Sequence, residues 1–136
     1  MKVLSFKLIV SLSLLLIYSC SKDEVAPNIS YAQINGLWKS DKLSLLITID
    51  STGKGDYYIS TTGTQLATWG NINSTVRDGD NKFTMNIGIY QQSSDKGIII
   101  PYNPATTILI DHLTFSSVEK LNIKSDSGSS IDYTRQ

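Results

Sequence analysis

Cysteine and histidine are almost absent from this 136-residue chain, which has one of each, Cys20 and His112. A lone thiol has no partner for an intramolecular disulfide, so packing and backbone pairing must hold the fold. A structural zinc site takes about four Cys or His ligands, which this chain cannot assemble. No Gly-x-Ser-x-Gly motif accompanies the Asp111-His112 pair. We therefore expect His112 to be a surface or turn residue.

Glutamate is scarce as well, because Glu119 is the only one after residue 24. The paired carboxylates of a glycosidase would have to come from aspartates scattered over separate turns. Asp78, Asp80 and Asn81 carry oxygens that suit calcium, but the EF-hand loop pattern is absent and a plain hairpin turn explains them. We expect a protein that is not an enzyme, with no catalytic residue, no metal and no cofactor.

An excess of positive charge is also lacking. The chain has 12 basic and 12 acidic residues, and residues 1–19 hold Lys2 and Lys7 but no acid, so the remainder has 10 against 12, or about −2. This balance excludes a nucleic-acid binder that works by charge. About 105 folded residues are enough for one domain with a core of its own.

No apolar run is long enough to span a bilayer. The longest, Leu8 to Tyr18, has about eleven residues, whereas a spanning helix needs roughly 20. The run follows two lysines and ends close to Cys20, which is the layout of a secretory signal over residues 1–19.

The end of this run carries a resemblance. Ile17, Ser19 and Cys20 resemble the cleavage site of a bacterial lipoprotein signal, with an aliphatic residue, a small residue and then the thiol. The resemblance implies that Cys20 is acylated, palmitate being one such acyl group, and becomes the lipid-anchored N-terminus. Two alternatives stay open: an ordinary secretory signal cut near Ser19 that leaves a free thiol, and a buried helix with a structural cysteine.

A short charged run follows the cysteine, Ser21-Lys22-Asp23-Glu24. It resembles the surface-export signal of some Gram-negative lipoproteins, and Ser21 in place of Asp is compatible with delivery to the outer membrane. The implied location is the outer membrane, lipid-anchored and exposed at the cell surface; the alternative is a solvated tether. Residues 20–31 include Pro27 and show no periodicity, so we interpret them as the lipidated N-terminus and a flexible tether before a domain at residues 32–136.

Apolar and polar residues alternate through most of the domain, which indicates half-buried strands and an all-β fold. In residues 43–50, for example, Leu43, Leu45, Ile47 and Ile49 share one face. We expect eight strands, at residues 43–50, 56–60, 65–73, 82–89, 98–100, 106–115, 119–124 and 131–135. The turn residues at 77–81, which include Asp78-Gly79, predict a hairpin, and Gly88 predicts a bulge.

Eight short antiparallel strands form either a β-sandwich or a closed up-and-down barrel. Gly36-Leu37-Trp38 precedes the first predicted strand, and Arg135 lies on the last. Here the chain resembles the lipocalin-like domains of Gram-negative lipoproteins, in which Gly-x-Trp enters the first strand and an Arg stacks on that Trp. The resemblance covers residues 34–135 and implies a small eight-stranded barrel closed by Gly36, Trp38 and Arg135. The alternative is that Trp38 is a core residue of another all-β domain.

Aromatic residues favour a binding function, because Tyr and Trp combine apolar area with a hydrogen-bonding tip. We take Tyr58, Trp69 and Tyr102 as a candidate binding surface. The run Ile98-Ile99-Ile100 places isoleucines on both faces of its strand, so one face must be covered by another part of the protein or present an exposed apolar surface.

Two functions remain, of which we favour the first. One is a lipocalin-like barrel that binds a small apolar or amphiphilic ligand. The other is a non-enzymatic interaction protein, an inhibitor or a structural envelope lipoprotein. The expected partners are the membrane, through the lipid, and either that ligand or an envelope protein.

Overall fold

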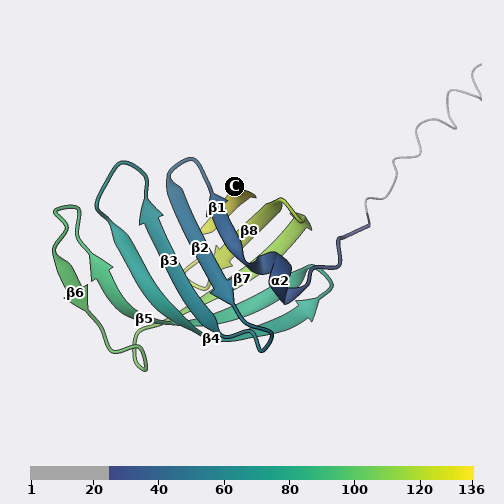
Figure 1. Cartoon of the computed structure of the whole chain (residues 1–136), viewed down its shortest axis with the longest axis horizontal. Coiled ribbons are helices and arrows are strands. Elements are labelled where there is room, and N and C mark those ends of the chain that lie inside the picture. Colours follow the sequence, from purple (N-terminus) through teal and green to yellow (C-terminus); the bar gives the residue numbers. More distant parts are fainter. Residues whose placement is uncertain (1–24) are drawn as a thin grey trace, which may run out of the picture.

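The chain folds into a closed antiparallel β-barrel of eight strands. A computed structural model describes residues 25–136 (Figure 1). Its elements are α2 (Tyr31–Ile34), β1 (Gly36–Lys39), β2 (Leu43–Ile49), β3 (Gly55–Thr61), β4 (Ala67–Gly79), β5 (Lys82–Ser93), β6 (Ile99–Pro101), β7 (Ile108–Ser117), β8 (Lys120–Ser125) and β9 (Ser130–Arg135). Barrel strands that follow one another in sequence are neighbours, and β9 pairs back onto β1. This closure decides between the barrel and the sandwich. No helix among residues 25–136 has the length and apolar character needed to cross a membrane.

The two-residue alternation sets the inside and the outside of the barrel. On β2, Leu45, Ile47 and Ile49 are buried, while Leu46 and Thr48 are exposed. The same alternation places four apolar side chains of β5 inside, namely Phe83, Met85, Ile87 and Ile89. Closing the sheet leaves no free edge along most of the eight strands, so the backbone groups of each strand find partners.

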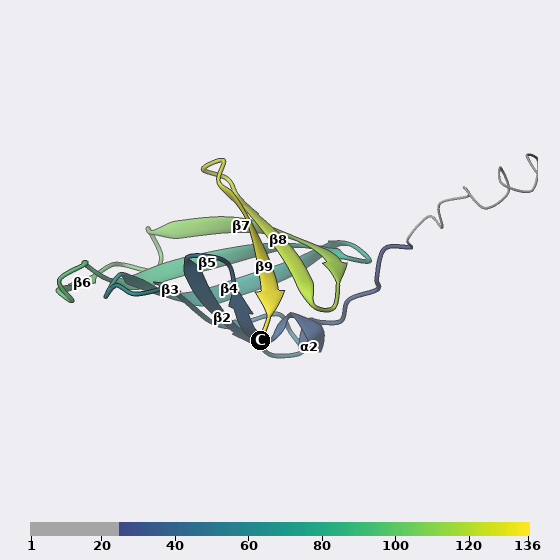
Figure 2. The ribbon, with the colours of Figure 1, turned by 90° about the horizontal axis from the view of Figure 1, so that it is seen from above.

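The number of barrel strands matches the sequence prediction, but one member is different. Residues 36–39, which the sequence put ahead of the first strand, form β1 and pair with both β2 and β9. The predicted strand at residues 98–100 is β6, a three-residue strand that pairs only with the end of β5 and lies outside the closed barrel. It projects at the opposite side of the molecule from α2 in both views (Figures 1 and 2).

The hairpin between β4 and β5 reverses within the predicted turn at residues 77–81. The reversal falls at Asp80-Asn81, two residues after the Asp-Gly pair, because Gly79 still pairs with Lys82. One local prediction needs correction. The bulge on β5 falls at Tyr90 and not at Gly88, since Trp69 pairs with Gln91 and Gly70 with Ile89.

Gly88 has a different structural role. A Cβ atom at this position would lie 2.5 Å from the carbonyl oxygen of Pro104, so only glycine lets the β6–β7 connection pack against β5.

The packed chain begins earlier than residue 32. Ile29 is completely buried, its backbone N–H donates to the Asp80 carbonyl at 2.8 Å, and α2 starts at Tyr31. Among the described residues, only the segment before Ile29 therefore fits the interpretation as a flexible tether.

Helix α2 covers one end of the barrel, which we call the closed end. Trp38, Phe83 and Phe115 fill it, with ring centroids 5.7 Å apart for Trp38–Phe115 and 6.0 Å for Phe83–Phe115, both edge-to-face. Ile29 and Ile34 complete the packing. Each such buried side chain contributes about 1.5–3 kcal/mol by leaving water, so this end is the rigid base of the fold.

Candidate ligand site at the open end of the barrel

The other end of the barrel, which we call the open end, contains a cavity. Residues of β3, β4, β5, β7, β8 and β9 line it, and its volume is about 380 Å³. This size is within the range of small-molecule sites, which run from roughly 300 to 1,000 Å³. Six of its fourteen lining residues are aliphatic: Ile59, Ile89, Ile108, Leu109, Ile123 and Ile131. The barrel is thus packed at the closed end and hollow at the open end.

One charged side chain lines the cavity. Asp111 stands on β7 on the same face as Leu113 and Phe115, and its exposed fraction is 4%. Its Oδ2 accepts a hydrogen bond from the Tyr57 hydroxyl across the barrel, at a long 3.4 Å. No Lys or Arg lines the cavity with it. A buried carboxylate without a cation is costly, so its presence here calls for a reason beyond packing.

The surroundings change the ionisation of the groups in the cavity. Burial raises the pKa of Asp111 from 3.8 to about 6, although the Tyr57 hydroxyl, His112 and Ser125 each lower it. Burial also raises the pKa of Tyr133 to about 12, with Asp111 adding to the rise. Burial and the same carboxylate raise the pKa of Tyr57 well above its usual value. At neutral pH the site therefore holds one carboxylate and two neutral phenols.

A hydroxyl beside Asp111 is left without a partner. Ser125 faces Asp111 directly across the β7–β8 pair and is 8% exposed. Its Oγ is fully buried and makes no hydrogen bond of normal geometry with any described residue, although it is near enough to lower the pKa of Asp111. Native proteins leave few such groups unsatisfied, so this hydroxyl marks a position where a polar partner can bind.

The open end has an apolar rim. The side chains of Ile98, Ile99 and Ile100 are 61%, 52% and 44% exposed, and Leu66 and Ile108 are exposed nearby at the same end. Leu66 and Ile100 line a second hollow of about 330 Å³, which shares Ile59, Thr68 and Gln92 with the cavity. An apolar body that enters the cavity would meet apolar surface along its way.

The barrel wall is open beside the cavity as well. Strands β1 and β9 pair over only two positions, Trp38–Arg135 and Lys39–Thr134, and then separate toward the open end. A groove of about 900 Å³ lies in the gap and shares Ile131 with the cavity. The groove and the cavity therefore adjoin at Ile131.

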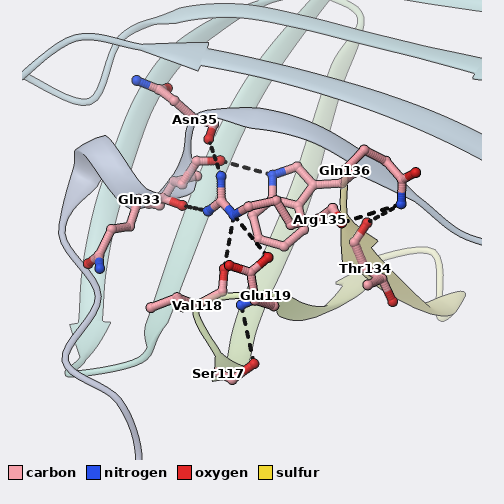
Figure 3. Close-up of polar contacts among 10 residues, drawn as sticks. Gln33, Asn35, Ser117, Val118, Glu119, Thr134, Arg135 and Gln136 are labelled. Atoms are coloured by element: carbon pink, nitrogen blue, oxygen red, sulfur yellow. Dashed lines mark hydrogen bonds and ion pairs between the residues drawn. The ribbon is translucent and has the colours of Figure 1, made fainter.

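The structure brings Trp38 and Arg135 together at the closed end. The Arg135 guanidinium carbon lies 4.3 Å from the centroid of the Trp38 ring. Arg135 Nη1 donates to the Asn35 carbonyl at 2.7 Å, Nη2 donates to the Gln33 carbonyl, and Nε donates to the Val118 carbonyl at 3.0 Å (Figure 3). Glu119 adds an ion pair at 3.9 Å.

Gly36 makes room for this cluster. Its φ is +144°, and a Cβ atom there would lie 2.7 Å from Arg135 Nη1. A side chain at position 36 would displace the guanidinium, so the glycine, the tryptophan and the arginine form one structural unit that joins β1 to β9.

The candidate binding surface from the sequence divides into two places. Tyr58 and Trp69 pair directly across β3 and β4 on the outer wall, where both are half-buried with ring centroids 5.3 Å apart. Tyr102 is exposed just after β6, and its N–H donates to the Tyr90 carbonyl. None of the three lines the cavity.

His112 lies on the outer wall, as expected of a surface residue. Its Nε2 is 2.7 Å from Asp126 Oδ1 and its Nδ1 is 3.1 Å from Thr84 Oγ1. The order hydroxyl, imidazole, carboxylate resembles a catalytic triad, but the Thr84 proton is donated to Asp78 at 2.5 Å, and none of the three residues lines a hollow described above. Among the described residues no group of His, Cys, Asp and Glu is arranged to hold a metal.

The proposed lipidation residue Cys20 and the proposed export signal, Ser21, Lys22, Asp23 and Glu24, lie outside the described residues. The cavity residues, in contrast, are fully described but were not singled out from the sequence. The alternation of side chains along the strands could have identified them, because Asp111 shares its face with Leu113 and Phe115, and Ser125 shares its face with Ile123. A charge on the apolar face of a strand marks an interior polar group.

Comparison with known proteins finds no matching family model, no matching curated protein and no matching solved structure.

Proposed function

We propose that this chain is a lipoprotein whose lipocalin-like barrel binds a small apolar or amphiphilic ligand in the open-end cavity. The observation that carries the proposal is the cavity itself, about 380 Å³ inside a barrel whose other end is tightly packed. Its lining combines a largely apolar wall with a few polar groups, the usual composition of a small-molecule site. The resemblance of Gly36, Trp38 and Arg135 to the lipocalin pattern supports the same reading, because their observed stacking is what that pattern requires.

The proposed location follows from the N-terminal residues. Acylation at Cys20 anchors the protein to the outer membrane, and Ser21 to Glu24 direct it to the cell surface. The described chain enters the barrel at Ile29, beside the closed end. The open end consequently faces away from the anchor and toward the aqueous phase. No catalytic step is part of this proposal, because the polar groups of the cavity include no activated nucleophile.

The test is native mass spectrometry of the full-length protein extracted from its membrane. Thr68 points into the cavity from β4, so Thr68→Trp is expected to fill the space and to remove a bound small molecule seen in the wild type. Thr48→Trp makes the same substitution on the exposed face of β2 and is expected to keep the bound mass. An empty wild-type barrel, or a bound mass that survives Thr68→Trp, would contradict the proposal.

A second function is favoured by the exposed apolar surface at β6. Ile98, Ile99 and Ile100 are exposed together, and β6 is an edge strand whose outer side pairs with no other described strand. Such an edge is suited to pairing with a strand of an envelope protein. Crosslinking in intact cells from position 99 would recover one reproducible partner protein if this function holds, and no partner if β6 only guides a ligand.

A further inference from the structure

The cavity has a net negative charge that nothing in it balances. Asp111 is its only charged residue, and the residues that face it are Tyr57 from β3, Ser125 from β8, Tyr133 from β9 and Met85 from β5. All four are uncharged at neutral pH. The charged groups nearest in sequence, His112 and Asp126, pair with each other on the outer wall.

We propose that the ligand carries a primary ammonium group, which pairs with the carboxylate of Asp111, on an apolar body that fills the rest of the cavity. This inference rests on the proposed ligand-binding function and names the chemical class of the ligand.

The acceptors around Asp111 match the donors of an ammonium group. An ammonium has three N–H donors and no acceptor. The site offers three kinds of oxygen on neighbouring strands: the Asp111 carboxylate on β7, the unpaired Ser125 hydroxyl on β8, and the Tyr133 hydroxyl on β9. A bound ammonium would satisfy these groups together and would neutralise the buried charge.

The same charge selects against other amphiphiles. A fatty acid or another anion would place a second negative charge beside Asp111 with no cation between them, which is unfavourable at low dielectric. A neutral alcohol would satisfy one or two oxygens but leave the carboxylate without a counter-ion. The rest of the lining, with Ile59, Ile123 and Ile131, suits an aliphatic or aromatic body.

The pairing makes ligand affinity depend on pH. Below about pH 6 the proton on Asp111 competes with the ammonium, because the pKa of this carboxyl in the empty barrel is about 6. The dissociation constant of an amine should therefore rise roughly tenfold for each pH unit below that value and stay flat above it.

The experiment is calorimetry on the purified full-length protein with three probes of one shape: 2-phenylethylamine, 2-phenylethanol and 3-phenylpropionate. At pH 7.5 we expect the amine to bind about tenfold more tightly than the alcohol, and the carboxylate to bind most weakly. Asp111→Asn keeps the shape of the side chain and is expected to reduce the amine-to-alcohol ratio to about one and to abolish its pH dependence. Asp56→Asn removes the same charge from the exposed face of β3 and should change neither.

The outcomes separate this inference from the function on which it rests. If amine and alcohol bind equally, or if the amine preference survives Asp111→Asn, the ammonium assignment is wrong while ligand binding stands. If none of the three probes binds, although the wild type is folded, both the assignment and the binding function are contradicted.

Discussion

The carboxyl of Asp111 is ionised at neutral pH inside a barrel that gives it one long hydrogen bond, 3.4 Å from the Tyr57 hydroxyl. Its pKa rises from 3.8 to about 6 on folding, so the folded protein holds this proton more tightly than the unfolded chain. Deprotonation between about pH 4 and pH 6 therefore lowers the free energy of unfolding. At full ionisation the loss is about 3 kcal/mol. A group that costs this much is typical of a binding site and not of a structural one.

This cost leads to a prediction for the unliganded protein. Asp111→Asn removes the ionisation but keeps an acceptor for Tyr57, so the variant should exceed the wild type in free energy of unfolding by about 1–3 kcal/mol at pH 7.5. The gain should nearly vanish at pH 3, where the wild-type carboxyl is largely protonated in both the folded and the unfolded state. Urea denaturation at both pH values measures it.

Asp56→Asn is the matched control for this prediction. It lies on the exposed face of β3 next to Tyr57, and its effect should stay within about 0.5 kcal/mol at either pH. A wild type that is as stable as Asp111→Asn at pH 7.5 would show that the carboxylate is compensated in the fold.

For single residues, the sequence indicates which side chains share one face of a strand, but not which side chains of different strands meet inside the barrel. Asp111 and Tyr133 each fall in line with apolar neighbours, so their burial follows from alternation. Their approach to Tyr57, more than 50 positions away from Asp111, depends on how far the strands are staggered around the barrel. That stagger is set by turns and bulges, and the bulge on β5 lies at Tyr90, two residues from the position that we predicted.

Among the elements, β1 and β9 form the shortest seam of the barrel. Only two residue pairs join them, so the cluster around Arg135 supplies much of the closure. We predict that Arg135→Met lowers the free energy of unfolding by about 2–4 kcal/mol, because it removes the contact with Trp38 and leaves the Gln33 and Asn35 carbonyls unpaired. Amide exchange should speed up first at the seam, including the Gln136 N–H that donates to the Leu37 carbonyl.

Arg77→Met provides the comparison for the seam. Arg77 also covers an aromatic ring, with its guanidinium carbon 4.8 Å from the Phe83 centroid, and it donates to the Ile29 carbonyl at 2.6 Å. It lies on β4, away from the seam, so its loss should destabilise the fold without faster exchange at the Leu37–Gln136 pair. Equal exchange in the two variants would mean that Arg135 has no special part in closing the barrel.

The number of barrel strands was easier to predict than which segments form them. Alternation located seven of the eight barrel strands, since these strands bury one face. It missed β1, whose four residues offer too few positions for a period, and whose entry is marked only by the Gly-x-Trp resemblance. It included β6, which is rich in isoleucine but exposed at all three positions. Residue type alone does not distinguish a barrel strand from an exposed edge.

At the scale of the whole molecule, the two ends of the barrel have different chemistry. The closed end holds the aromatic core, the Arg135 cluster and the point where the described chain enters, at Ile29. The open end holds the cavity, with its buried carboxylate, and the isoleucine rim. An anchor that precedes Ile29 would consequently hold the closed end toward the membrane and leave the open end free to exchange its ligand with the solution.

This polarity predicts that anchoring and binding are separable. Cys20→Ala removes the thiol that we propose as the acylation site, so we expect the protein to move from the membrane fraction to the soluble fraction of the cell. Its affinity for the ammonium probe should match that of the wild type, because the site lies at the other end of the barrel from the anchor. Fractionation and calorimetry on the same preparation measure both. A variant that stays with the membrane would refute the lipid anchor, and one that is released but binds the probe more weakly would show that anchoring and binding are coupled.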